Sequence, residues 1–233
     1  MTTRTGGVSP PPYASLNPAS HVGDDPAAVA ENRRILRAAL PAEPLWLNQV
    51  HGAGVAQFPA AGTPDADAAV AHRPGQVCAV LTADCLPVLF CDVSGQAVAA
   101  AHAGWRGLAA GVLERTVEAL GVQPGKVLAW LGAAIGPAAF EVGPEVRQAF
   151  VAQHAEAARA FAPGAGDRLL ADIYELARIR LAAIGVTQVY GGGLCTHADA
   201  SRFYSYRREG VTGRMASLVW LTPPNPDTPT ETP

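Results

Sequence analysis

The stretch VCAVLTADCLPVLFCDVSGQAVAAAHA, residues 77–103, carries the clearest strand pattern of the chain. It holds three short apolar runs, each bounded by polar or turn-forming residues. Apolar runs of about four to eight residues are typical of strands that are buried on both faces of a sheet. We therefore predict three buried strands close together in sequence, at Val77–Thr82, Leu86–Cys91 and Ala97–Ala101.

Outside this stretch, helix and strand patterns alternate. Asp25 and Pro26 form a helix start, and the apolar positions that follow predict a helix that stops at Pro41. Two more helices are expected, at Gly107–Leu120 and after the capping residue Asp172. Further strands are expected at Leu45–Val50, Lys126–Leu131, Val186–Tyr190 and Met215–Leu221. This interleaving predicts an α/β or mixed α+β domain.

Composition narrows the class of protein. Hydrophobic residues make up 49% of the 233 residues, and charged residues make up 16%, so a large core can form. The formal net charge of −3 gives no basic field for nucleic acid or anionic lipid. We find no signal-peptide pattern and no apolar run of membrane-spanning length. The four cysteines lie in apolar runs and fit reduced thiols, so we expect a cytoplasmic protein.

The domain boundaries are predicted from the ends of these patterns. No internal linker or repeat interrupts residues 7–221, so we expect a single domain there. Residues 1–6 and 222–233 are rich in residues such as Gly, Pro and Thr, and we expect both segments to be flexible. We expect a monomer or a small homo-oligomer.

Three side chains suggest a chemistry. His51, Cys85 and His102 each lie at the end of an apolar run, in the segments NQVHG, TADCLP and AHAGWRG. Two imidazoles and a thiolate suit zinc, and three protein ligands leave the fourth tetrahedral position open, as in catalytic sites. The three lie far apart in the sequence, so only the fold can bring them together. Taken singly, Cys85 also fits a small buried hydrophobe, and each histidine an ordinary core or surface residue.

Other polar residues near these segments are candidates for substrate contacts. Asp84 is predicted to orient one of the histidines, although a solvated carboxylate is equally compatible. Arg106 suits binding of a phosphate or carboxylate, but it also fits a surface arginine in the first turn of the following helix. Arg207 and Arg208 lie in SRFYSYRREG, residues 201–210, which could stack a base and hold an anion or could be an amphipathic strand. Asn48 is a further substrate-binding candidate.

Taken together, these segments resemble the laccase-domain family, also called polyphenol-oxidase-like proteins. This family includes zinc-type bacterial purine nucleoside phosphorylases and the peptidoglycan-editing factor. The matching segments include Gly7-Val8-Ser9, His21–Asp25, Asn48–Gly52, Thr82–Val88, His102–Gly107, Ile135–Pro137, Phe140–Gly143, Phe203–Arg208 and Thr212–Met215. The chain departs from the family at Ala138-Ala139, where cysteines are common, and at Asn17–Ser20.

The resemblance implies a fold and a set of activities. The expected fold has two packed mixed β-sheets flanked by helices, as in the laccase-domain, cysteine-hydrolase-like proteins. His51, Cys85 and His102 would be the zinc ligands, and they would be catalytic together with Asp84. The implied activities are phosphorolysis of adenosine, inosine and methylthioadenosine, and deamination of adenosine. Purine nucleosides and phosphate would be the ligands.

Three alternatives use the same residues. A hydrolase with Cys85 as nucleophile and a histidine as base could edit peptidoglycan precursors. A copper-dependent polyphenol oxidase is implied by the family name, but multicopper chemistry needs a histidine-rich cluster, and the chain has six scattered histidines. A binding module stabilised by metal, without catalysis, is the third.

Overall fold

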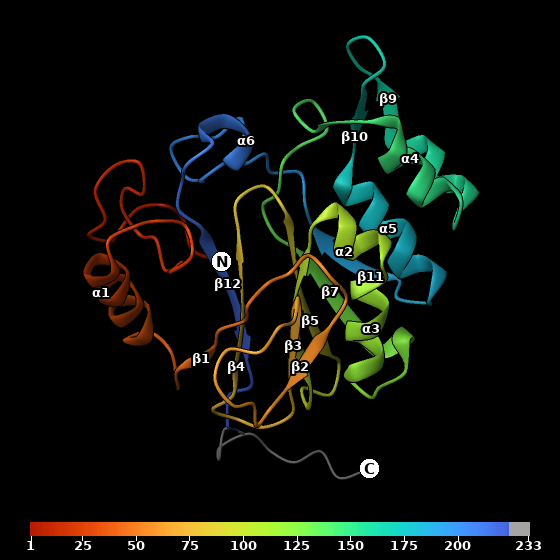
Figure 1. The fold of residues 1–233 in the computed structure, drawn as a ribbon. Helices are drawn as coiled ribbons and strands as arrows, with labels where there is room; N and C mark the ends of the chain where they lie inside the picture. The colour runs from red at the N-terminus through yellow and green to blue at the C-terminus, as the bar shows by residue number, and fades with distance from the viewer. Residues whose placement is uncertain (224–233) are drawn as a thin grey trace.

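The computed structural model describes residues 1–223. A six-stranded mixed sheet forms the centre of the fold, with a three-stranded mixed sheet packed on one face and helices on the other (Figure 1). The larger sheet has the spatial order β11 (Gln188–Gly191), β7 (Val127–Leu131), β5 (Leu86–Asp92), β6 (Val98–Ala103), β3 (Ala68–Ala71) and β2 (Val55–Gln57). The smaller sheet has the order β1 (Pro44–Leu45), β4 (Val77–Thr82) and β12 (Met215–Trp220). The predicted fold class is thereby confirmed.

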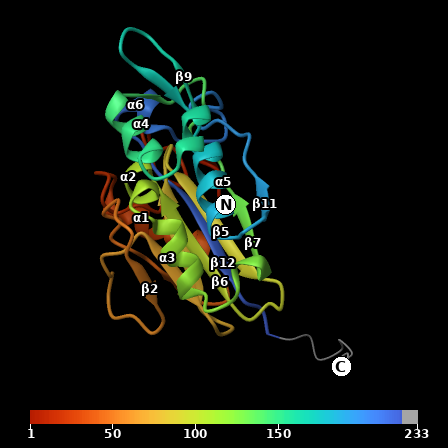
Figure 2. The same cartoon turned by 90° about the vertical axis from the view of Figure 1, so that its right-hand side faces the viewer.

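The remaining elements surround this pair of sheets. A third, antiparallel sheet consists of β8 (Glu141–Val142), β10 (Leu169–Ala171) and β9 (Phe161–Pro163). The helices are α1 (Pro26–Arg37), α2 (Trp105–Ala109), α3 (Val112–Ala119), α4 (Pro144–Val151), α5 (Ile173–Ala183) and α6 (Tyr206–Glu209). Figure 2 shows α3 and α5 lying along the larger sheet. In residues 1–223 we find no helix that is both long and apolar enough for a membrane span.

Small side chains let the two mixed sheets pack closely. Successive residues of a strand face opposite sides, so Ala68 and Val70 join the helix-side core, whereas Ala69 contributes to the core between the sheets. On β6, Val98 and Ala100 also face the smaller sheet. The same alternation places the side chains of Asp67 and His102 on that inner side, at one end of β3 and β6.

Most predicted strands are confirmed within one or two residues, but two elements differ. The single helix expected at Gly107–Leu120 is wrong, because Gly111 adopts a left-handed φ of 91° and separates α2 from α3. The strand expected at Leu45–Val50 is shorter, since only Pro44–Leu45 pairs with β4. Beyond this strand, the Gln49 side chain binds the Leu81 backbone. Its Nε2 donates to the Leu81 carbonyl at 2.8 Å, and its Oε1 accepts from the Leu81 amide at 2.7 Å.

The first residues of the chain are hydrogen-bonded to its C-terminal part. The Thr2 amide donates to the Ala216 carbonyl and the Arg4 amide to the Arg202 carbonyl, both at 2.8 Å. Residues 1–6, predicted to be flexible, therefore contact the C-terminal part of the domain. The amphipathic-strand interpretation of residues 201–210 is wrong, since this segment contains the short helix α6, capped by Ser205. Most of the predicted C-terminal segment, residues 224–233, lies outside the described residues.

Candidate active site

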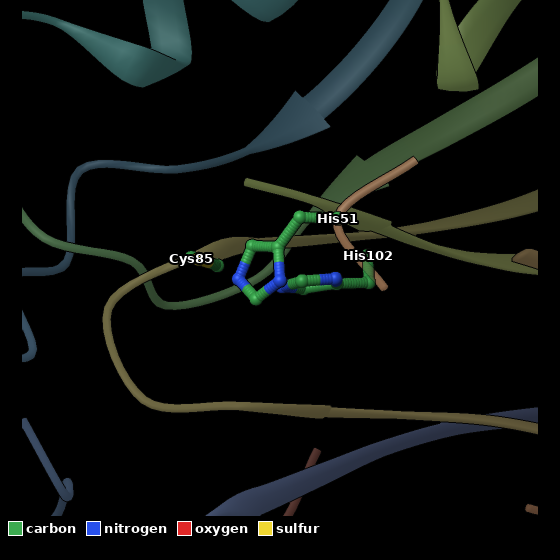
Figure 3. A group of neighbouring side chains, drawn as sticks. All are labelled: His51, Cys85 and His102. Carbon is green, nitrogen blue, oxygen red and sulfur yellow. The ribbon is translucent and has the colours of Figure 1, made fainter. Parts of the chain in front are cut away.

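The fold brings His51, Cys85 and His102 together. Their side-chain ligand atoms all lie within 4.8 Å of one another, and the two imidazole rings meet edge to face (Figure 3). His51 comes from the loop after β1, Cys85 from the turn between β4 and β5, and His102 from β6. His51 is exposed and His102 is buried, so the cluster reaches the surface on the His51 side.

Two of the turns that carry these ligands have unusual backbone conformations. His51 has a φ of 60° and Asp84, the residue before Cys85, has a φ of 91°. Left-handed conformations are uncommon for residues with a side chain, and they persist where surrounding contacts enforce them. The Asp84 carbonyl accepts a 2.9 Å hydrogen bond from the Ile135 amide, which helps to hold the Cys85 turn.

Asp67, which the sequence analysis did not single out, contacts His102. Its Oδ1 atom lies 2.8 Å from His102 Nδ1, and the His102 amide donates to the Asp67 carbonyl at 2.7 Å. Because a carboxylate only accepts, Nδ1 carries the hydrogen that faces Asp67, and Nε2 is the atom that could bind a metal once it has lost its own proton. The prediction that Asp84 orients a histidine is not borne out by the hydrogen bonds, since Asp67 makes this contact. The register of β3 against β6 places it there.

The cluster perturbs its own protonation. Burial alone would raise the pKa of the Cys85 thiol, but interactions with His102 and His51 outweigh burial and lower this pKa to about 6. For His102, burial would lower the pKa, whereas Cys85 and Asp67 raise it to about 9. At neutral pH the sulfur is therefore a thiolate, which is the form that binds metal or attacks an electrophile.

The residues present fit a single metal ion. Two imidazole nitrogens and a thiolate match zinc or copper in ligand type. Gly104 keeps the space beside them open, since a Cβ atom there would lie 3.0 Å from Cys85 Sγ and 3.1 Å from His51 Cδ2. Any larger residue at position 104 would press on two of the three ligands.

An apolar cavity lies beside the Cys85 ligand. Its lining residues are Ala83, Asp84, Cys85, Trp105, Ile135, Phe140, Ile173, Tyr206 and Arg207. Aromatic side chains with one cation at the rim can accommodate a flat, partly polar ligand. Arg207 and Tyr206 belong to the segment 201–210, which was expected to hold an anion and stack a base, whereas Trp105 and Phe140 were not expected to line a pocket.

Asp84 links the cluster to the wall of this cavity. Its buried carboxylate accepts the Thr196 hydroxyl at 2.6 Å and the Arg207 amide, at the start of α6, at 2.7 Å. Asp84 therefore links α6 to the turn that carries Cys85, whereas the sequence analysis had predicted that it orients a histidine.

The predicted substrate-binding residues have different surroundings. Arg106 is exposed and stacks on Trp105, with 4.6 Å from its guanidinium carbon to the ring centre. Arg207 donates to the Glu141 carbonyl at 3.0 Å and lines the cavity. Arg208 is engaged elsewhere, donating to the carbonyls of Thr196, His197 and Phe203 and to the Glu209 carboxylate. Asn48 donates to Asp65 at 2.7 Å.

Arg214 is a further cation near the cluster that the sequence analysis did not select. Its guanidinium carbon lies 5.9 Å from the Tyr206 ring centre, and Tyr206 lines the cavity. Burial lowers the pKa of Arg214, while the nearby Cys85 and Asp84 act in the opposite direction. The only available signal was its place in the segment Thr212–Met215, which carried the family resemblance.

The sequence matches the family model described as multi-copper polyphenol oxidoreductase laccase over residues 1–222. It is 62% identical over 222 residues to a purine nucleoside phosphorylase of Pseudomonas aeruginosa, a match covering 95% of this chain and 92% of that protein. It is 58% identical over 226 residues to the purine nucleoside phosphorylase YfiH of Escherichia coli K12, with coverage of 94% and 92%.

Solved structures are similar over nearly the whole chain. A Neisseria meningitidis protein of the family DUF152 superposes with a TM-score of 0.92 at 53% identity, covering 96% of this chain and 93% of that one. YlmD of Geobacillus stearothermophilus gives a TM-score of 0.84 at 30% identity, with coverage of 95% and 90%. The fold, the segments that carry the three-residue cluster and the match over residues 1–222 lead to one conclusion: the chain belongs to the multi-copper polyphenol oxidoreductase laccase family.

Proposed function

We propose that the protein is a zinc-dependent purine nucleoside phosphorylase that acts on adenosine, inosine and methylthioadenosine and also deaminates adenosine. The observation that carries this proposal is the aromatic cavity that opens directly beside Cys85. The names of relatives that are 62% and 58% identical support the choice of purine nucleosides and phosphate as substrates. Such substrates also agree with a cytoplasmic location.

The metal, the aromatic residues of the cavity and Arg207 would each have a distinct role in the two reactions. Bound zinc would supply a Lewis acid and a water whose pKa is lowered to about 7. Trp105, Phe140 and Tyr206 would pack on the purine and exclude water, while Arg207 at the rim would bind an anion. In phosphorolysis, a phosphate oxygen bonds to the anomeric carbon as the glycosidic bond breaks, and the base leaves with a proton. In deamination, water adds at the purine carbon that carries the amino group, and ammonia leaves.

Product analysis on adenosine tests both reactions. Zinc-loaded protein with phosphate should release adenine and ribose 1-phosphate, and without phosphate it should release only inosine and ammonia. Inosine and methylthioadenosine should be cleaved only when phosphate is present. Absence of all these products from zinc-loaded, folded protein would contradict the proposal.

A second candidate is a cysteine hydrolase that edits peptidoglycan precursors. It is favoured by one observation, the Cys85 thiol whose pKa is lowered to about 6 beside His102. The two candidates predict opposite responses to metal, because zinc on the sulfur blocks its attack on an amide. Amide cleavage that is strongest after metal removal would support the hydrolase.

Copper oxidation has less support. Within residues 1–223 a single group of three His, Cys, Asp or Glu side chains is arranged to hold a metal, and it is His51, Cys85 and His102. A multicopper oxidase needs additional copper centres rich in histidine, and the whole sequence has six histidines.

A further inference from the structure

We propose that Asp67 is a positioning residue that sets the geometry of both histidines of the cluster before a metal binds. The inference rests on the metal centre proposed above and assigns a role to a residue outside the three ligands. Asp67 is fully buried and immediately precedes β3.

One carboxylate contacts both histidine-bearing segments. Oδ1 accepts from His102 Nδ1 at 2.8 Å and from the His51 amide at 3.0 Å. Oδ2 accepts from the Gly52 amide at 2.7 Å and from the Val50 amide at 3.2 Å. Asp67 therefore fixes the ring of one ligand and the backbone of the other.

The contact with the His51 loop holds an unfavourable turn. His51 has a φ of 60°, in the left-handed region that residues with a side chain seldom adopt. Three consecutive amides, from Val50 to Gly52, point at the Asp67 carboxylate and lose their acceptor if it is removed. Without Asp67 the loop would relax toward more common conformations, and the His51 ring would no longer face Cys85.

The partners of Asp67 also demand a carboxylate. All four are N–H donors, and an amide side chain would turn its own NH₂ group toward at least one of them. Among residues 1–223, His102 is the only basic side chain within ion-pair distance of Asp67.

Asp92 provides a matched control in the same chain. It too is buried, and its carboxylate accepts the amides of Ser94, Gln96 and Ala97 at 3.1, 2.7 and 2.7 Å. However, Asp92 lies at the end of β5 opposite to Cys85 and contacts no ligand of the cluster. Loss of either carboxylate should destabilise a turn, but only loss of Asp67 should change the metal site.

The first test compares Asp67→Asn with Asp92→Asn by competition for zinc against a chelator, and by the visible spectrum of the cobalt-substituted proteins. Asp67→Asn should lower zinc affinity by about 10- to 100-fold and alter the cobalt bands. Asp92→Asn should leave the zinc affinity within about twofold of the wild-type value and the cobalt bands unchanged. It should lower the melting temperature of the metal-free protein. Wild-type zinc affinity and an unchanged cobalt spectrum in Asp67→Asn would overturn the proposal.

The second test uses the unmodified chain, so it remains informative if Asp67→Asn does not fold. Hydrogen exchange at the amides of His51 and Gly52 should be slow in the metal-free protein, because Asp67 already holds them. Fast exchange that slows only after zinc is added would overturn the proposal. If the wild-type protein does not bind zinc at all, the metal centre and the role of Asp67 both fail. If it binds zinc and only the Asp67 tests fail, the metal centre stands.

Discussion

Asp84 accepts a 2.7 Å hydrogen bond from the main-chain amide of Arg207, and this bond joins the turn that presents Cys85 to the helix that walls the cavity. Two segments far apart in the sequence thereby share one buried carboxylate. Asp84 and Cys85 both line the cavity, so the cavity adjoins the cluster of His51, Cys85 and His102 through these two neighbouring residues.

Replacing Asp84 should weaken substrate binding in the cavity without removing the metal from the cluster. In Asp84→Asn one carboxylate oxygen becomes an NH₂ group, which accepts no hydrogen bond, so either the Thr196 hydroxyl or the Arg207 amide loses its acceptor, and an unpaired buried group costs about 1–3 kcal/mol. We expect the KM for adenosine to rise at least about tenfold while zinc remains bound, since Asp84 is not a ligand. Steady-state kinetics and zinc analysis of the same preparation check this; an unchanged KM would contradict it.

Gly104→Ala should weaken metal binding without unfolding the protein. The added methyl group would lie 3.0 Å from Cys85 Sγ and 3.1 Å from His51 Cδ2, so both ligands must move. We expect zinc affinity to fall at least about tenfold, in the range seen when ligand orientation is disturbed. Gly125→Ala is the control, because a Cβ at that position meets nothing within 4 Å. Equal zinc affinity in the two variants would show that Gly104 is not needed for the site.

The arginines should differ in their effect on phosphate. Arg207→Ala and Arg106→Ala test the two exposed candidates, and a charge-assisted hydrogen bond to phosphate contributes about 1.5–3 kcal/mol. We expect at least one of them to raise the phosphate KM by about tenfold or more while sparing most deamination. Arg208→Ala should instead lower the melting temperature, since three carbonyls lose their donor. Unaltered phosphate dependence in both exposed variants would place the anion elsewhere, with Arg214 next to be tested.

Thiol modification should distinguish two of the cysteines by pH. Only the thiolate reacts, so in metal-free protein the alkylation rate of Cys85 should rise with pH through about 6 and level off above it. Burial raises the pKa of Cys78 to about 12, so Cys78 should stay unmodified at neutral pH in the folded protein. Peptide mass spectrometry after timed alkylation measures both rates. A Cys85 rate that keeps rising to pH 9, or one that zinc does not slow, would contradict this account.

Local sequence patterns were sufficient for much of the fold. Continuous apolar runs predicted β4, β5 and β6, because strands buried on both faces need no alternation. The Asp25 and Asp172 caps predicted α1 and α5. By contrast, β3 is the run Ala-Ala-Val-Ala, and alanine has low strand propensity, so packing between two sheets determines its conformation.

The residues of the candidate site could be predicted only where their type and neighbouring sequence point to a function. Cys85 and the two histidines stood out by ligand type and by their flanking turns. Asp67 carries no local signal, since it reaches His102 through the pairing of β3 with β6 and reaches His51 through a loop. Arg208 looked like an anion-binding residue, yet the carbonyls that occupy it come from segments whose position depends on the whole fold.

Zinc-dependent phosphorolysis at His51, Cys85 and His102 is tested by the zinc content of the protein and of Cys85→Ala, measured together with adenosine turnover in phosphate. We expect about one zinc per wild-type chain, held by these three side chains, and phosphate-dependent release of adenine. Cys85→Ala, with two remaining protein ligands, should lose most of the zinc and the activity together. Full zinc occupancy in Cys85→Ala, or wild-type turnover in protein stripped of metal, would rule out this role for the cluster.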